Sequence, residues 1–276
     1  MNAEWVVSKP QLQRTAYLIE ATRRHPLWMR TAYAFAALMV ACGVCALFDD
    51  RTINGVSVWS KPFKFSLSIA VYFATLAWFV PLLPNGYIKS RRGRWLTFVP
   101  MACAIFEIGY IVLQAARGEA SHFNSTSPFY SVMYGLMGVG AVALVTICLW
   151  MGVSILRSRG TASPYAFAVG VGLVLTFALG GGFGGYLGGQ MSHWVGGSQS
   201  DANGTWLMRW SRDGGDLRVA HFFGMHAMQV LPLLAALFSA RTPHRLAIGA
   251  VVGLASAYAV LCVYTFVQAL HGVPFL

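Results

Sequence analysis

The sequence has few charged residues. They make up 11% of the chain, whereas soluble domains carry roughly 25%. Most of these charges lie between long apolar runs, so the composition excludes an ordinary soluble domain. The chain also lacks the alternating polar and apolar pattern of a transmembrane β-barrel.

Two further absences narrow the class. No lysine follows Lys89, which excludes a retinal protein, because that chemistry needs a lysine in the last helix. Residues 1–30 contain no short apolar core with a cleavage site, so they are not expected to be a cleavable signal. We predict that they form a cytoplasmic N-terminal segment, with a short helix on the membrane surface over residues 10–24.

Seven apolar runs are present, each near the ~20 residues that cross a bilayer. Backbone groups in lipid must be satisfied within their own segment, so the runs predict helices. The expected fold is an all-α bundle of seven transmembrane helices, forming one domain over residues 31–276 with a longer outer loop at about 190–216. The predicted spans are 31–48, 63–83, 95–115, 128–156, 164–189, 217–239 and 246–270.

The basic residues are distributed unevenly between the two ends of these spans. Thirteen of the 20 Lys and Arg lie on the side of the N-terminus, and six of the nine acidic residues lie on the other side. The positive-inside rule then predicts a cytoplasmic N-terminus and an outer, periplasmic C-terminus. The basic charge therefore reflects topology, so the expected partner is the lipid bilayer and not a nucleic acid.

Several helix starts carry capping signals. Ser127, Ser163 and Thr242 each precede a proline, as an N-cap before Pro at the first helical position does. Asp216 is expected to cap the sixth span, and "TING" at 52–55 predicts a turn.

Polar residues recur at helical spacing in the outer half of four spans. We expect them to line one polar cavity that faces outward, although Lys61 and Lys64 could instead extend to lipid phosphates. The stripes are Lys61, Lys64, Ser68, Tyr72 and Thr75; Glu107, Tyr110 and Gln114; His221, Met225 and Met228 with His226 and Gln229 beside them; and Tyr264, Gln268 and His271.

Glu107 lies several residues inside a span, where a carboxylate costs ~2.5 kcal/mol or more. It should be protonated or paired, and a contact with His226 is allowed by depth. We predict Glu107, His226 and His221 as catalytic groups, with structural hydrogen bonding between helices as the alternative. The predicted substrate-binding residues are Lys61, Lys64, Asn124, Arg218, Gln229 and Gln268.

His221 and His226 are five residues apart, which places them about 140° apart around a helix. One metal cannot take both from a regular helix, so a metal or haem would use one of them with partners from elsewhere. His122, His221 and His226 are the predicted metal ligands, with His193, His271 and Glu107 as further candidates. Three histidines, or two with a carboxylate, would suit zinc or iron.

The segment "GGGFGGYLGG" at 180–189 repeats glycine every fourth residue. This small-xxx-small pattern predicts close approach to a neighbouring helix, and it could also serve in oligomerisation. The five cysteines all fall inside predicted spans, and we interpret "CGVC" at 42–45 as helix packing more readily than as a redox pair.

Three motifs, WxKPxKF (59–65), SHFN (121–124) and GDLRxxHFxGxHAxQxLP (215–232), resemble a family of uncharacterised bacterial multi-pass membrane proteins. The resemblance implies a shared fold in the bacterial inner membrane and brings no established activity. Met225 and Met228 depart from the leucines of that pattern. The membrane zinc hydrolases related to ceramidases are a loose analogy, since they carry HxxxH where this chain has HxxxxH.

Three functions remain open at this point. The first is a membrane-embedded enzyme, with or without a divalent metal or haem, acting on a lipid-soluble or periplasmic small molecule with an anionic or polar head. The second is a small-solute transporter or channel, although no inverted repeat is visible. The third is a membrane sensor or assembly subunit.

Overall fold

The computed structural model describes residues 20–159, 163–238 and 241–276. Within them are seven helices long and apolar enough to cross a membrane. Each overlaps one predicted span along most of its length, so the prediction of a seven-helix membrane protein is confirmed. Residues 10–19 of the predicted surface helix lie outside the described residues, and residues 20–24 are helical.

Five of the seven spans are single helices, and two continue into a second type of turn. The bounds are α2 (Pro26–Phe48), α3 (Ser60–Phe79) continued by the 3₁₀ turn η1 (Val80–Leu82), α4 (Arg91–Arg117), α5 (Pro128–Arg159), α6 (Pro164–Leu175) continued by η2 (Thr176–Gly181) and α7 (Gly182–Gly189), α8 (Leu217–Phe238) and α9 (His244–Leu270).

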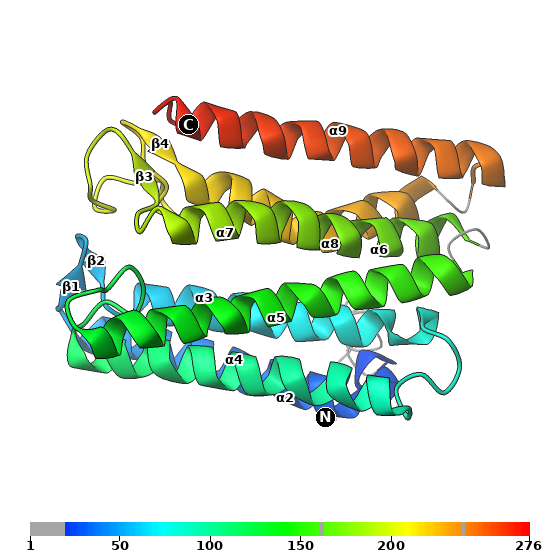
Figure 1. Cartoon of the computed structure of the whole chain (residues 1–276), viewed down its shortest axis with the longest axis horizontal. Coiled ribbons are helices and arrows are strands. Elements are labelled where there is room, and N and C mark those ends of the chain that lie inside the picture. The colour runs from blue at the N-terminus through cyan, green and yellow to red at the C-terminus, as the bar shows by residue number, and fades with distance from the viewer. Residues whose placement is uncertain (1–19, 160–162, 239–240) are drawn as a thin grey trace, which may run out of the picture.

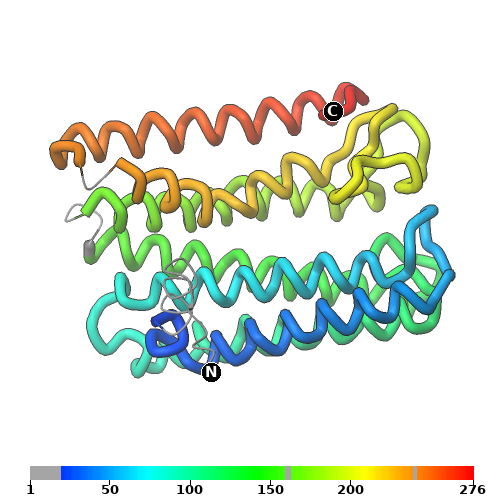
Figure 2. Tube along the Cα trace, turned by 180° about the vertical axis from the view of Figure 1, so that it is seen from behind, coloured from blue at the N-terminus to red at the C-terminus, as the bar shows by residue number. Residues whose placement is uncertain are grey.

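The helices form two layers, which Figures 1 and 2 show from opposite sides. One layer holds α9, α8, α3 and α2 in that order, and the other holds α6 with α7, then α5, then α4. The closest packing joins α2 to α3, α6 to α5 and α8, and α8 to α9. By contrast, α3 and α8 are neighbours in their layer, but their main chains are not closely packed against each other.

Two short hairpins lie at one end of the bundle, which we call the hairpin end (Figure 1). β1 (Thr52–Ile53) pairs with β2 (Val56–Ser57) through Asn54 and Gly55. Both turn residues have positive φ, as a two-residue hairpin of type I′ requires, which confirms the predicted turn. β3 (Trp194–Val195) pairs with β4 (Gly215–Asp216), so the long loop between them starts and ends beside α8.

The helix caps follow the sequence at three of four places. The side chains of Ser127 and Ser163 accept from the backbone N–H groups of Tyr130 and Ala166. Asp216 Oδ1 accepts from the Arg218 N–H at 3.0 Å and so caps α8. The fourth prediction is wrong, because α9 begins at His244 with Pro243 at its N-cap in place of Thr242.

The glycine-rich segment packs tightly along α8. An added Cβ on Gly180 would lie 2.9 Å from the Met225 nitrogen, and one on Gly224 would lie 2.6 Å from the Gly180 nitrogen. The close approach predicted for Gly180 and Gly184 is therefore confirmed. Gly185 and Gly189, on the second ladder, have no contact within 4 Å of an added Cβ. The described part of this segment includes one π-helical turn, η2.

Candidate functional site

The polar residues of α3 and α8 lie opposite one another. Both helices start at the hairpin end and run in the same direction (Figure 1). The Gln229 side-chain amide on α8 donates to the Thr75 hydroxyl on α3 at 3.2 Å. Nearer the hairpin end, Lys64 Nζ donates to the Met208 carbonyl at 3.4 Å. The first bond crosses the loosely packed boundary between α3 and α8, and the second joins α3 to the loop between β3 and β4.

Lys61 and Lys64 place two ammonium groups near the start of α3. Neither forms an ion pair with a carboxylate among the residues that the structure describes. The Lys61 ammonium lies inside the bundle, and part of the surface of its side chain stays accessible. The Phe65 ring lies 5.6 Å from its Nζ.

Glu107 of α4 is 6% exposed, and its Oε2 has no hydrogen-bond partner in the described part of the chain. A Cβ added to Gly140 of α5 would lie 4.0 Å from this oxygen, so the carboxyl faces α5. The nearest opposite charge is the Lys61 ammonium, which lies within range of electrostatic interaction without a direct ion pair. An isolated buried carboxyl beside an ammonium is an arrangement suited to proton transfer.

Arg218 belongs to a buried ion network. Its guanidinium donates to Asp216 at 2.6 Å, to Asp201 at 2.8 Å and to the Arg209 carbonyl at 2.7 Å. Asp201 and Asp216 are both buried. The guanidinium therefore holds the loop between β3 and β4 against α8 through Nε and Nη2, whereas Nη1 bonds none of the described residues.

His193 extends this network, since its Nε2 lies 3.3 Å from Asp201 Oδ1. Burial lowers the pKa of His193, and the bond to Asp201 opposes that shift. Burial alone would raise the pKa of Asp201, but the hydrogen bond from His193 and the nearby Arg218 charge outweigh it and lower that pKa. A neutral histidine and an ionised aspartate are thus favoured here.

His122 lies in the 118–127 connection and contacts aromatic rings on two helices. Its ring centroid is 5.6 Å from Phe65 on α3 and 5.9 Å from Tyr134 on α5. Burial, together with the Lys61 charge, lowers the pKa of His122 well below its ordinary value. The uncharged ring is therefore the stable form close to Lys61.

His221 faces the glycine-rich segment. Its Nδ1 lies 2.8 Å from the Gly180 carbonyl, and a Cβ on Gly184 would meet its Cε1 at 2.7 Å. The carbonyl can only accept, so Nδ1 carries the proton. His221 thus joins α8 to η2 and α7 and has a structural contact as well as its predicted catalytic role.

His226 faces α3. Its Nδ1 lies 3.3 Å from Gln229 Oε1, and its ring centroid lies 4.3 Å from Phe222. The contact with Glu107 that depth allows is not a hydrogen bond, because Glu107 makes none in the described residues and His226 bonds Gln229. The two predicted catalytic groups therefore do not form a hydrogen-bonded pair.

Two predicted substrate-binding amides have internal partners. Asn124 Oδ1 accepts from both the N–H and the hydroxyl of Thr126, while its amide donates to the Ala120 carbonyl. The Gln268 amide donates to the Pro274 carbonyl at 2.6 Å. Both amides stabilise connections at the hairpin end.

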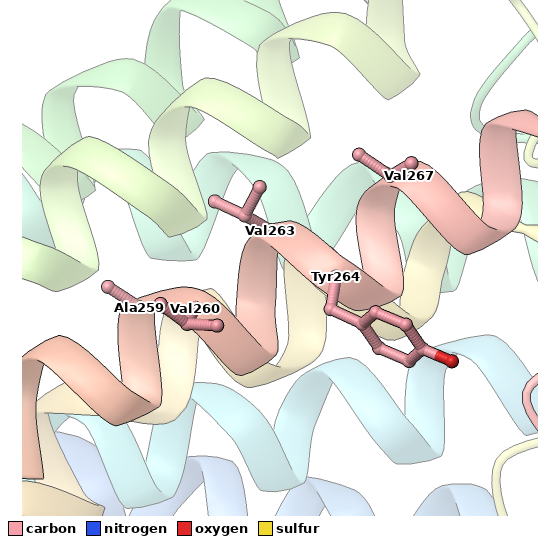
Figure 3. Close-up of a pocket in the computed structure, with 5 residues that line it drawn as sticks. All are labelled: Ala259, Val260, Val263, Tyr264 and Val267. Carbon is pink, nitrogen blue, oxygen red and sulfur yellow. The ribbon is translucent and has the colours of Figure 1, made fainter.

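The prediction that the α9 stripe lines the same polar region is wrong. Tyr264 is 64% exposed on the outer side of the bundle. It lines an open apolar depression of about 430 Å³ together with Ala259, Val260, Val263 and Val267 (Figure 3). This depression has a lipid-facing composition, so the polar chemistry lies elsewhere.

The expected metal site finds no support in the described chain. Over residues 20–159, 163–238 and 241–276, no three His, Cys, Asp or Glu side chains gather closely enough to hold an ion. His122, His221 and His226 contact different partners: the Phe65 and Tyr134 rings, the Gly180 carbonyl and Gln229. The five cysteines are free, including Cys42 and Cys45.

Sequence reasoning missed two features of the region. The first is the pairing of Asp201 with Arg218, because 17 residues of loop separate them. Their opposite charges were the only available signal. The second is the contact between Gly184 and His221. A repeat of glycines predicts space beside the helix, but it does not identify the side chain that occupies that space.

These features define a multi-pass membrane protein in which a cluster of polar and ionisable side chains occupies the half of the bundle nearest the hairpin end. No protein-family model, curated protein or solved structure matches the chain. The resemblance to an uncharacterised bacterial family therefore stays a prediction.

Proposed function

We propose that the protein is a membrane-embedded enzyme that acts on a lipid-soluble or periplasmic small molecule with an anionic or polar head. In this proposal the chain lies in the bacterial inner membrane with its N-terminus in the cytoplasm and its hairpin end outside. The excess of Lys and Arg at the opposite end supports this orientation.

The observation that carries the proposal is the relation between Lys61 and Glu107. A carboxyl oxygen without a partner lies within electrostatic range of an ammonium group that also has no ion pair in the described chain. Both groups are costly inside a membrane, so a functional role is their default explanation. Glu107 would donate or accept a proton, and Lys61 with Lys64 would hold the anionic or polar head of the substrate.

His221 and His226 complete the proposed site from α8. His226 would contact the substrate directly, whereas His221 would position α8 through the Gly180 carbonyl. Arg218 would act through the loop that it holds and not as a direct anion ligand.

A transporter receives less support from the same residues. The polar side chains shared by α3 and α8 stop at Thr75 and Gln229, and beyond them α8 continues as an apolar segment from Val230 to Phe238. A solute path through this part of the chain would therefore have to cross an apolar half-membrane.

The test is identification of the bound molecule. The purified protein would be released from lipid nanodiscs inside a mass spectrometer, alongside the variants Lys61→Gln, Glu107→Gln and Lys89→Gln. We expect a small molecule with an anionic or polar head that is retained by the wild type and by the Lys89→Gln control but lost from Lys61→Gln. Glu107→Gln should keep the molecule and stop its conversion to product.

Two outcomes would overturn the proposal. One is steady solute flux in proteoliposomes that stops in Glu107→Gln, which would identify a transporter. The other is equal retention of the molecule by Lys61→Gln and by wild type, which would separate binding from the Lys61 ammonium.

A further inference from the structure

Two polar contacts of α3, one with α8 and one with the loop that precedes α8, limit a stretch of the α3–α8 boundary that has the properties of a ligand site. We call this stretch the α3–α8 interval. Its inner limit is the bond from Gln229 to Thr75, and its outer limit is the bond from Lys64 to Met208. Thr75 lies eleven residues after Lys64, which corresponds to about 16 Å of helix at 1.5 Å per residue.

Among residues 20–159, 163–238 and 241–276, no other helix covers this interval on the bilayer side. Ser68 and Val71 on α3 are exposed, although both lie between Lys64 and Thr75. Phe222 and His226 also keep accessible surface. The interval therefore opens laterally into the membrane.

α5 closes the interval from behind. The Tyr72 hydroxyl on α3 donates to the Leu144 carbonyl at 2.9 Å, and Cys148 Sγ contacts Met228 Sδ on α8 at 3.8 Å. A molecule in the interval would thus have protein on three sides and lipid on the fourth.

The hydrogen bonds fix which nitrogen of His226 carries the proton. The single hydroxyl proton of Thr75 goes to the Val71 carbonyl at 2.7 Å, so Thr75 must accept from the Gln229 amide. This orients Gln229 Oε1, an acceptor, toward His226 Nδ1 at 3.3 Å. Nδ1 therefore carries hydrogen, and the neutral ring has its lone pair on Nε2.

Nε2 of His226 has no hydrogen bond to any described residue, and the side chain keeps accessible surface. An acceptor at membrane depth without water needs a donor, because an unmade hydrogen bond there costs free energy. The interval offers no protein donor to it among the described side chains.

From this geometry we infer that the α3–α8 interval binds a lipid-soluble phenol or quinol, whose hydroxyl donates to His226 Nε2. The aromatic head fits beside the Phe222 ring, and the hydrocarbon part of the molecule extends through the lateral opening. This inference deepens the proposed function, on which it rests for the location of the site, by naming the substrate class.

The experiment compares two probes of equal shape. Para-hexylphenol has the hydroxyl donor, and para-hexylanisole replaces its hydrogen with a methyl group. Diethylpyrocarbonate, which reacts with an unprotonated imidazole nitrogen, would be added to protein in nanodiscs, and modification of each histidine would be measured by peptide mass spectrometry. We expect His226 to react, the phenol to protect it, and the anisole to need about tenfold higher concentration, the equivalent of one hydrogen bond.

Two variants test the site without removing His226. Ser68→Trp fills the interval and should abolish protection by the phenol, whereas Leu67→Trp on the neighbouring exposed face should not. His244 is exposed at the start of α9, far from the hairpin end. Its reaction should be unchanged by either probe, so it serves as the internal control.

Equal protection by both probes, or protection that survives Ser68→Trp, would overturn the inference. The same holds if His226 does not react while His244 does. The readout of this experiment is binding. Protection by the phenol, together with no conversion of the bound molecule to product, would therefore support the inference and refute the proposed enzyme. An anionic substrate with turnover but without phenol protection would do the reverse.

Discussion

The Gly184 Cα lies directly against the imidazole of His221, so a Cβ at that position would come within 2.7 Å of Cε1 and 2.8 Å of Nδ1. The same Nδ1 donates a hydrogen bond to the Gly180 carbonyl at 2.8 Å. One glycine therefore provides the space in which a histidine connects α8 to the π-helical turn.

Replacing this glycine should weaken the bundle. Gly184→Ala is expected to cost about 1–3 kcal/mol of unfolding free energy, because the ring must move and its hydrogen bond is strained. The matched control is Gly185→Ala, where an added Cβ meets nothing within 4 Å. Thermal unfolding in detergent would compare them, and equal melting temperatures would show that His221 moves freely.

Arg218→Gln should destabilise the protein more than it weakens ligand binding. The change leaves Asp201 and Asp216 buried without their guanidinium, and removal of one partner from a buried pair costs about 3–5 kcal/mol. Arg212→Gln, an exposed arginine in the same loop, is the control. Unfolding and retention of the bound molecule would be measured together. Full stability with lost retention would restore Arg218 as a direct anion ligand.

The free energy of unfolding should fall as the pH decreases from about 7 to 5. Burial lowers the pKa of His25 to about 4 and that of His122 well below its ordinary value, so both stay neutral in the folded protein. In the unfolded chain they take up protons near pH ~6.5, which favours unfolding below that pH.

His122→Phe keeps the ring contacts and removes the proton site, so it should reduce this pH dependence. His271→Phe, at an exposed position at the end of α9, should not. Melting temperatures between pH 5 and 8 would test this, and an unchanged pH dependence in His122→Phe would contradict the burial of a neutral ring.

The orientation can be tested with single cysteines in a cysteine-free background. Ser125 lies in the connection from α4 to α5, Ser198 in the loop between β3 and β4, and Ser158 in the last turn of α5, at the other end of that helix; all three positions are exposed. An impermeant thiol reagent added to intact cells should label the first two and spare the third. Labelling of Ser158→Cys alone would reverse the proposed topology.

The sequence by itself determined the seven helices and most of their ends. A bilayer imposes a length on apolar segments and requires helical hydrogen bonding, so composition over about 20 residues is sufficient. Caps such as Ser163 and Asp216 were predictable because their partners lie two or three residues away along the chain.

Only the tertiary structure decided which polar residues meet. Helical spacing placed Lys61, Glu107, His226 and Tyr264 at one end of the bundle. It did not determine the rotation of each helix about its own axis. That rotation is set by packing, and it turned Tyr264 outward, left Glu107 facing α5 and brought Gln229, the partner of His226, against α3. Contacts between distant segments, such as Gly184 with His221 and Asp201 with Arg218, depend on the same packing, and no local pattern encodes it.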